Sequence, residues 1–335
     1  MLCRAGDEWR TFTDISGRRM VAKVLRVEAE HVVVELKSSG EQVSIRINKL
    51  SVGDMLFVLE HKATGGTVKP DRAAAAPATG ESAAAALYSR TRKEIEAGIR
   101  EIAKRPKPKD LAAEVHEATK KLNIYRFLCG LPADVQGDAQ CSKNAEDAAL
   151  ACKQAGTISH SLGHSTEKCN LSSMGNVVAT VSQFMEDGGD NNRDSRGHRA
   201  WCLNPPMGKV GFGSGGKSFA AMWCMDSSGK SQKGTWAYPG MGLFPLEYLH
   251  GNAWSFYGID QATNPKVEIF RLAKRPEQAF PATADIPGHV IKVSRVSRAM
   301  MNGINFELAE PAKRGIYWVR VTGESLHEGY LVELY

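Results

Sequence analysis

A low-complexity stretch between residues 63 and 86 most constrains how this chain can fold. It contains the alanine runs Ala73–Ala76 and Ala83–Ala86, together with Pro77 and Gly80, and it shows no repeating apolar face. A segment of this composition has no large side chains to bury, so it is typical of a linker. We therefore predict that residues 7–62 fold separately from the rest of the chain.

Residues 7–62 show the pattern of short strands. The segments Met20–Val27 and Val32–Leu36 are rich in Val and Leu, and Val43–Ile47 alternates polar and apolar side chains with a period of two. Between them, Ser38–Glu41 has the composition of a hairpin turn. A chain of roughly fifty residues made of short strands can bury a core by curling into a small barrel, which is the fold we predict here.

Residues 87–228 contain four stretches in which apolar side chains recur every three or four positions. These stretches predict helices over Leu87–Ile102, Leu111–Tyr125, Ser142–Ala155 and Met174–Met185. Basic side chains stand between the apolar positions of the first stretch, so we expect them to form a solvated face.

Residues 229–335 are again rich in β-type segments separated by Pro, Gly and Asn. Their spacing predicts a C-terminal antiparallel β-sandwich without catalytic groups, and its aromatic residues are expected in the core. The predicted core aromatics are Trp254, Phe256, Phe270, Phe306 and Trp318. The predicted strands are Ala253–Ile259, Val267–Leu272, Val290–Val296, Ile304–Leu308, Tyr317–Thr322 and Tyr330–Leu334.

The segment Gly211–Ser218 matches two nucleotide-binding patterns, G-x-G-x-x-G and the P-loop pattern G-x-x-x-x-G-K-S. A phosphate-binding loop of this kind must be followed by a helix, whose free amides face the phosphates. Here the next segment, Phe219–Met225, is short and bulky and suits a strand. We predict a Gly-rich hairpin that joins Lys209–Phe212 to Phe219–Met225, and no nucleotide site.

Two histidines stand in polar, turn-rich surroundings and are the candidate functional residues. His160 lies within Ile158–Ser161, and His198 begins a second segment that follows Glu186 and Asp187. Imidazoles and carboxylates from separate parts of a chain make up metal sites and acid–base sites. Without a metal, the same groups could simply hydrogen-bond one another.

Cysteine usage bears on the compartment. Of seven cysteines, six lie between Cys129 and Cys224, and none forms a Cys-x-x-Cys pair. An even set confined to one region favours disulfides in an oxidising compartment, and buried free thiols are the alternative. The N-terminal segment is too short for a signal peptide and no apolar stretch could span a membrane, so a cytoplasmic location stays open.

Several motifs of the middle segment occur in a recognisable order: Leu122-Asn123-x-x-Arg126, Gly130-Leu131-Pro132, Ser159-His160-Ser161, Gly197-His198-Arg199, Leu203-Asn204-Pro205 and Val210-Gly211-x-Gly213. Together they resemble the bacterial branch of the CAP superfamily, which includes cysteine-rich secretory, antigen five and pathogenesis-related proteins, over roughly Asp110 to Asp226. The resemblance implies an α-β-α sandwich with a central cleft and an exported protein. At the N-terminus, Trp9–Asp14, Gly17 and Asn48–Ser51 resemble the SLA homology domain one, an SH3-like module of peptide-binding adaptors.

The family cleft usually holds two histidines and two acidic residues. His160 and His198 match the histidines, and Glu186, with Asp187 as its rival, matches the second acid. The first acid belongs to a Gly-Glu-Asn triplet, which Ser173–Asn176 does not contain. Two imidazoles and a carboxylate, His160, His198 and Glu186, could still bind a divalent metal such as zinc.

These observations combine into one hypothesis. We predict an α+β multidomain chain with an SH3-like β-barrel (7–62), a linker (63–86), a CAP-like α-β-α domain (87–228) and a β-sandwich (229–335). The expected function is that of an exported, periplasmic or cell-surface binding protein, whose His-containing cleft takes a small apolar or peptide ligand, a metal or a protein partner. A metal-dependent hydrolase or peptidase at the same cleft and an intracellular adaptor acting through the barrel are the alternatives. The net charge of +6 is dispersed, so no nucleic-acid partner is expected.

Overall fold

The computed structural model describes residues 9–13, 19–27, 31–46, 50, 58, 87–189, 191–230, 234–259, 265–324 and 326–335. The chain divides into two compact units, one of residues 1–78 with 232–234 and one of residues 79–231 with 235–335. The boundary falls inside the segment predicted to be a linker, whose own residues lie outside the described part.

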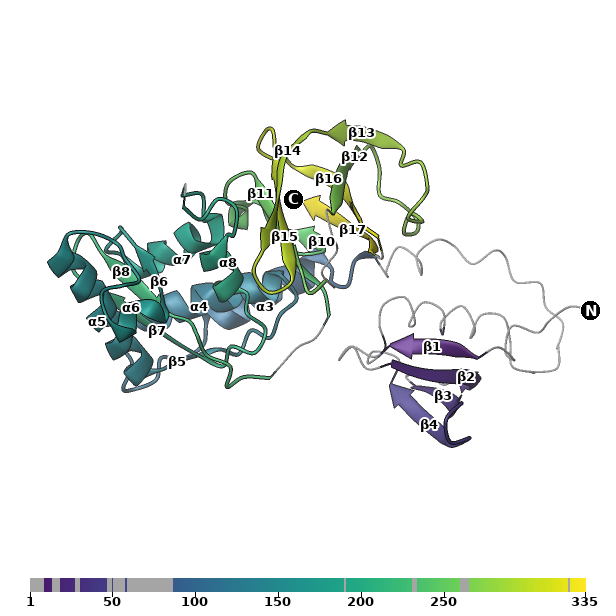
Figure 1. The fold of residues 1–335 in the computed structure, drawn as a ribbon, viewed down its shortest axis with the longest axis horizontal. Coiled ribbons are helices and arrows are strands. Elements are labelled where there is room, and N and C mark those ends of the chain that lie inside the picture. Colours follow the sequence, from purple (N-terminus) through teal and green to yellow (C-terminus); the bar gives the residue numbers. More distant parts are fainter. Residues whose placement is uncertain are drawn as a thin grey trace, which may run out of the picture. The chain divides into compact units, whose positions relative to one another are not determined.

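The first unit contains a four-stranded antiparallel sheet in the order β1-β2-β3-β4 (Figure 1). Its strands are β1 (Arg10–Thr13), β2 (Arg19–Val27), β3 (His31–Leu36) and β4 (Gln42–Arg46). The predicted hairpin turn is confirmed: the Leu36 amide donates to the Glu41 carbonyl at 2.9 Å, and Gly40 has a φ of 69°. One face of this sheet buries Phe12, Ala22, Val24, Val32, Val34, Leu50 and Val58.

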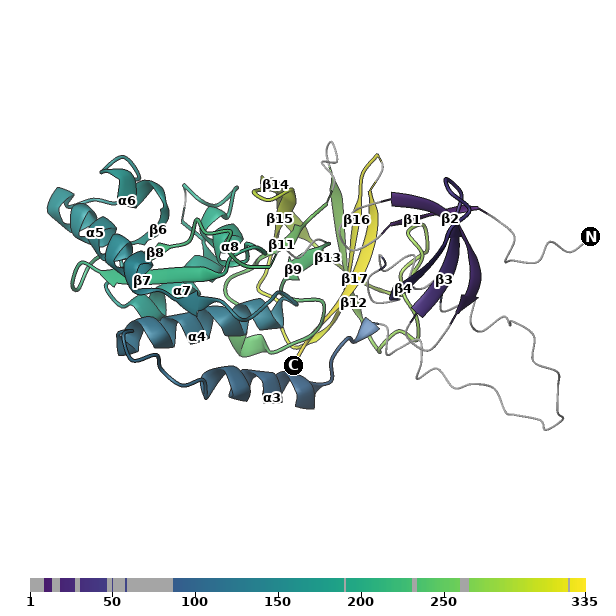
Figure 2. The ribbon, with the colours of Figure 1, turned by 90° about the horizontal axis from the view of Figure 1, so that it is seen from below.

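The second unit contains the helices. They are α3 (Arg92–Ala103), α4 (Ala113–Leu128), α5 (Ala139–Ala155), α6 (His164–Glu167), α7 (Val177–Glu186) and α8 (Gly197–Cys202). Local side chains account for several ends, because Thr91 and Glu94 form a capping box at α3 and Asn176 caps α7. By their residue ranges, the four predicted helices correspond to α3, α4, α5 and α7. Helices α3 and α4 lie side by side in both overall views (Figure 2).

A small sheet beside α5 explains the glycine-rich segment. It has the order β5-β7-β8-β6, from β5 (Gln136–Gly137), β6 (Cys169–Ser172), β7 (Lys209–Ser214) and β8 (Ala220–Trp223). β7 and β8 pair as an antiparallel hairpin, which confirms the prediction. A Cβ atom on Gly213 would lie 2.0 Å from the Glu146 amide nitrogen of α5. The glycines therefore let a helix backbone rest directly on the strand.

Replacing Gly213 with alanine is expected to lower the free energy of unfolding by about 1–3 kcal/mol, because the added methyl group would push α5 away from β7. The matched control is Gly189→Ala, whose added Cβ would meet no heavy atom within 4 Å. Urea denaturation followed by circular dichroism measures both variants. Equal stability of the two variants would contradict the close contact.

The C-terminal part of the second unit forms two further sheets, ordered β10-β17-β16-β12-β13 and β14-β15-β11-β9. Their side chains meet between them, since Trp254 of β11 contacts Tyr317 of β16 edge to face with ring centroids 5.6 Å apart. All five predicted core aromatics are buried. The strands are β9 (Trp236–Tyr238), β10 (Gly242–Phe244), β11 (Ala253–Tyr257), β12 (Lys266–Leu272), β13 (Gly288–Ile291), β14 (Val293–Ala299), β15 (Gly303–Leu308), β16 (Gly315–Thr322) and β17 (His327–Leu334), with a 3-10 turn at Leu246–Tyr248.

The predicted fold class is wrong. Among the described residues, 34% lie in strands and 26% in helices, and a central α-β-α sandwich of CAP type is not evident. One core instead joins α3, α4, α7 and α8 to both C-terminal sheets, with buried members from Ile95 to Leu334. The reason is visible in α4, where Asn123 and Arg126 are buried as well as the predicted apolar stripe of Leu122 and Tyr125. A helix buried on nearly all sides needs cover from more than one sheet.

No helix in the described ranges has both the length and the apolar character needed to cross a membrane.

Candidate functional site

Two of the predicted site residues, Asp187 and His198, form a pair where α7 ends and α8 begins. Asp187 follows α7 in the left-handed conformation (φ 49°) and is buried. One of its carboxylate oxygens lies 3.0 Å from Nδ1 of His198, and the other accepts the His198 amide at 2.9 Å. The Phe184 ring lies beside the imidazole at 4.9 Å between centroids. Asp187 thus orients the His198 ring through Nδ1, which leaves Nε2 for proton transfer or ligand contact.

His160 is engaged elsewhere. Its Nδ1 lies 2.9 Å from the Thr166 carbonyl oxygen, within its own loop. Across the described ranges, no three His, Cys, Asp or Glu side chains are close enough together to hold a metal ion. The predicted zinc ligands His160, His198 and Glu186 are therefore not brought together, and we derive no metal chemistry from them. The physical reason is that each imidazole is oriented by a neighbour of its own, His160 by Thr166 and His198 by Asp187.

A fully buried arginine holds the end of α7 against strand β11. The guanidinium of Arg199 donates to the carbonyl oxygens of Met185 (2.6 Å) and Glu186 (2.9 Å). On the side of β11 it donates to the carbonyl oxygen of Ala253 (3.0 Å) and the hydroxyl of Ser255 (2.8 Å). These bonds fix the backbone around Glu186 and Asp187 relative to the C-terminal sheet.

A buried ion pair lies next to this arginine. Arg196 contacts Glu307 of β15 through Nη2, and its Nη1 donates to the carbonyl oxygens of Glu186 (3.1 Å) and Asp187 (2.7 Å). Arg193 adds three further hydrogen bonds to the same carboxylate, at 3.1, 3.2 and 2.8 Å. Hydrogen bonds from Arg193, with the charge of Arg196, hold the pKa of Glu307 below its usual value, although burial opposes this shift. Burial lowers the pKa of Arg196, but a guanidinium stays charged at neutral pH.

These groups surround a polar hollow of about 200 Å³. Arg196, Ala253 and Glu307 are its buried members, whereas Glu186 and Arg193 are exposed. Arg196 is 3% exposed, yet its Nε has no hydrogen-bond partner within the described part of the chain. A buried donor without an acceptor is energetically costly, and the side chain that carries this donor lines the hollow. The remaining lining residues are Gly188, Gly251, Asn252 and Ala253.

Sequence reasoning found Glu186 but missed Arg193, Arg196 and Glu307. In residues 304–308, polar Asn305 and Glu307 alternate with apolar side chains. This pattern is typical of a strand with one solvent-exposed face. In the structure both faces of β15 are buried. The sequence did contain a signal, because three arginines lie between residues 193 and 199. Such a cluster predicts an acidic partner, and Glu307 on the polar face of a strand is a candidate for it.

The predicted disulfides are not found. All six cysteines in the described ranges are free thiols. Burial raises the pKa of Cys129 and of Cys169 to about 12, and it raises the pKa of Cys224 as well. Because the thiolate is the reactive form, these buried thiols are poor nucleophiles at neutral pH.

Comparisons of this chain with protein-family models, with curated proteins and with solved structures find no match.

Proposed function

We propose that this protein binds a small zwitterion, such as a free α-amino acid, in the polar hollow at the end of α7. The observation that supports this proposal above all is the buried Nε of Arg196, a charged donor without an acceptor beside a cavity. A carboxylate is the natural partner of a guanidinium in such a place. The proposed function is binding, as the sequence analysis also proposed. The proposed site, however, is the polar hollow and not a cleft formed by His160 and His198.

The charges around the hollow favour a ligand that carries both signs. Glu307 already accepts hydrogen bonds from Arg193 and Arg196, so it is satisfied within the protein. Glu186 is exposed and has no ion pair in the described residues, so it can accept an ammonium group. Its Oε1 and the Nη1 of Arg196 lie 3.7 and 3.8 Å from the position of a Cβ on Gly188. A negative and a positive group therefore both lie close to Gly188.

The size of the hollow limits the ligand. About 200 Å³ lies below the usual range of pockets for larger organic ligands. The lining is polar and includes only one nonglycine apolar residue, Ala253. A free amino acid with a small side chain meets both conditions, whereas a peptide or an apolar ligand does not.

Isothermal titration calorimetry with small amino acids tests this proposal. We expect glycine or alanine to bind the wild-type protein, and the amino acid amide and the N-acetyl derivative to bind at least about tenfold more weakly, because each lacks one charge. Glu186→Gln should weaken binding of the amino acid by a similar factor. Gly188→Leu should abolish it by filling the hollow, whereas Gly189→Leu, with no heavy atom within 4 Å of its Cβ, should bind normally. Binding that survives Gly188→Leu, or no binding of any small zwitterion, would refute the site.

The hydrolase stays the alternative. The Asp187–His198 pair supports it, because an imidazole oriented through Nδ1 can transfer a proton through Nε2. Export, a cell-surface partner and an adaptor role for the N-terminal unit remain predictions from the sequence.

A further inference from the structure

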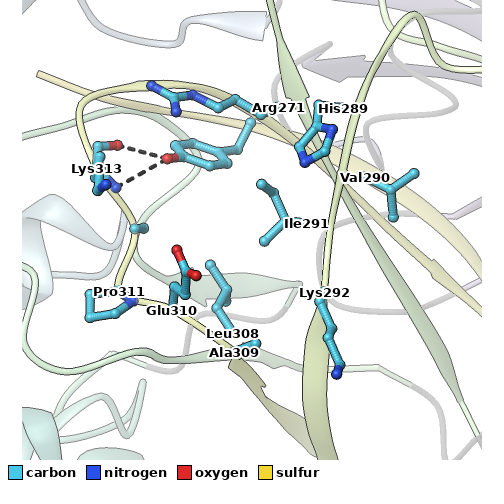
Figure 3. Close-up of a pocket in the computed structure, with 12 residues that line it drawn as sticks. Arg271, His289, Val290, Ile291, Lys292, Leu308, Ala309, Glu310, Pro311 and Lys313 are labelled. Carbon is cyan, nitrogen blue, oxygen red and sulfur yellow. Dashed lines mark hydrogen bonds between the residues drawn. The ribbon is translucent and has the colours of Figure 1, made fainter.

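A second hollow, of about 300 Å³, opens between the two C-terminal sheets where β13 passes into β14 (Figure 3). Strands β12 and β13 form one wall. The loop of residues 309–314, between β15 and β16, forms the other wall. Lys292, the residue between β13 and β14, lies at the edge of the hollow.

The strand register places charged side chains on the core face of a sheet. Arg271 of β12 stands opposite His289 of β13 and Tyr317 of β16, so the three side chains lie in a row on one face. Ile269 lies two residues earlier in β12 and therefore on the same face, and it is fully buried in the main core. The inner faces of packed sheets normally carry apolar side chains. Arg271 and His289, in contrast, are exposed, so this end of the face is open to solvent beside the hollow.

The charge around this hollow is mainly positive. Arg271, Lys292 and Lys313 line it, against the single carboxylate of Glu310. Within the described ranges, none of the three cations forms an ion pair. The Arg271 guanidinium is held in place, because its Nη2 donates to the Arg314 carbonyl at 3.0 Å. A fixed cation without a counterion next to a cavity suits an anionic ligand group.

The floor of the hollow is apolar and already formed. Ile291, Leu308 and Pro311 point toward its interior in the close-up view (Figure 3). The hydroxyl of Tyr317 donates to the Lys313 carbonyl at 2.8 Å and accepts the Lys313 amide at 3.1 Å. These two bonds fasten the loop of residues 309–314 against β16, so the wall does not have to be ordered by a ligand.

We propose that this hollow binds an amphipathic organic anion, in which a carboxylate is attached to a short apolar body. The carboxylate would lie at the rim that Arg271, Lys292 and Lys313 make positively charged, and the apolar body would cover Ile291 and Leu308. A volume of about 300 Å³ reaches the lower end of the range for small-molecule pockets, which favours a compact ligand. This site shares no lining residue with the zwitterion site, so each can fail without the other.

Octanoate is the probe, and isothermal titration calorimetry on the full chain is the measurement. We expect octanoate to bind, whereas 1-octanol lacks the charge and acetate lacks the apolar body, so each should bind at least about tenfold more weakly. Raising the salt concentration should weaken octanoate binding, because the cations are exposed. Equal affinity for octanoate and 1-octanol would refute the proposal, as would no octanoate binding at millimolar concentration.

Variants locate the site. Arg271→Gln and Lys292→Gln should each weaken octanoate binding by about tenfold, since each removes one cation from the rim. Lys274→Gln is the matched control, because Lys274 is an exposed cation just beyond β12 that does not line the hollow. Lys292 is exposed, so its replacement tests the site even if Arg271→Gln disturbs the fold. Unchanged affinity in Lys292→Gln, or an equal loss in Lys274→Gln, would place octanoate elsewhere and overturn the proposal.

Discussion

Replacing Glu307 with alanine is expected to lower the free energy of unfolding by about 3–5 kcal/mol, because it leaves a buried cation without its counterion. Glu307 is 4% exposed and Arg196 3%, so both charges are largely withdrawn from water. Arg193 also loses its hydrogen bonds to the same carboxylate.

Urea denaturation at pH 7 measures the change in the free energy of unfolding. The exposed Glu310 is the control, and its replacement with alanine should stay within about 0.5 kcal/mol of wild type.

The same pair predicts how stability depends on pH. The pKa of Glu307 is lowered in the folded protein relative to its ordinary value of 4.5, chiefly by hydrogen bonds from Arg193. A lowered folded pKa contributes stability above the unfolded pKa, and this contribution is lost as the pH falls through the folded pKa. The stability difference between wild type and Glu307→Gln should therefore be constant from pH 8 to about pH 5 and shrink below about pH 4. A difference that does not change between pH 7 and pH 3 would show that the carboxylate charge plays no part.

Replacing Arg126 with leucine is expected to lower the free energy of unfolding by about 3 kcal/mol or more, because four carbonyl groups, three of them in buried hydrogen bonds, lose their donor. Arg126 on α4 is fully buried, and burial lowers its pKa to about 10, so it remains charged at neutral pH. It ties the end of α4 to the turn that follows α8. Its guanidinium donates to the carbonyl oxygens of Pro132 (2.8 Å), Cys202 (3.1 Å), Asn204 (2.7 Å) and Pro205 (3.1 Å).

Arg126→Lys should be nearly as harmful, since an ammonium group cannot reproduce the planar fork of donors. The matched control is Arg92→Lys on α3, where the side chain is exposed, pairs with Glu96 one turn away and lies over the Tyr335 ring. That exchange should stay within about 0.5 kcal/mol of wild type. Thermal and urea denaturation of the three variants provide the comparison. If Arg126→Lys were as stable as Arg92→Lys, the guanidinium geometry would be unimportant.

The local elements were largely predictable from the sequence, and the candidate site only partly. The helices α5 and α7 and the hairpin of β7 and β8 follow from periodicity, caps and turn residues, which act between near neighbours. The closeness of Asp187 and His198 follows from their separation of eleven residues across one loop. The structure does not group His160, His198 and Glu186 as metal ligands, because the orientation of each imidazole depends on contacts that no local pattern encodes.

The sequence by itself determined four of the helices, most of the C-terminal strands and the burial of the five named aromatics. Only the tertiary structure decided that the middle segment and the C-terminal strands share one core. Strand β15 shows the physical reason: Phe306 faces the other sheet, while Asn305 and Glu307 face the segment around Arg196. Alternation gives a strand two faces but does not say what covers the polar one. Here an arginine 111 residues away along the chain covers it, and a contact of that range has no local signature.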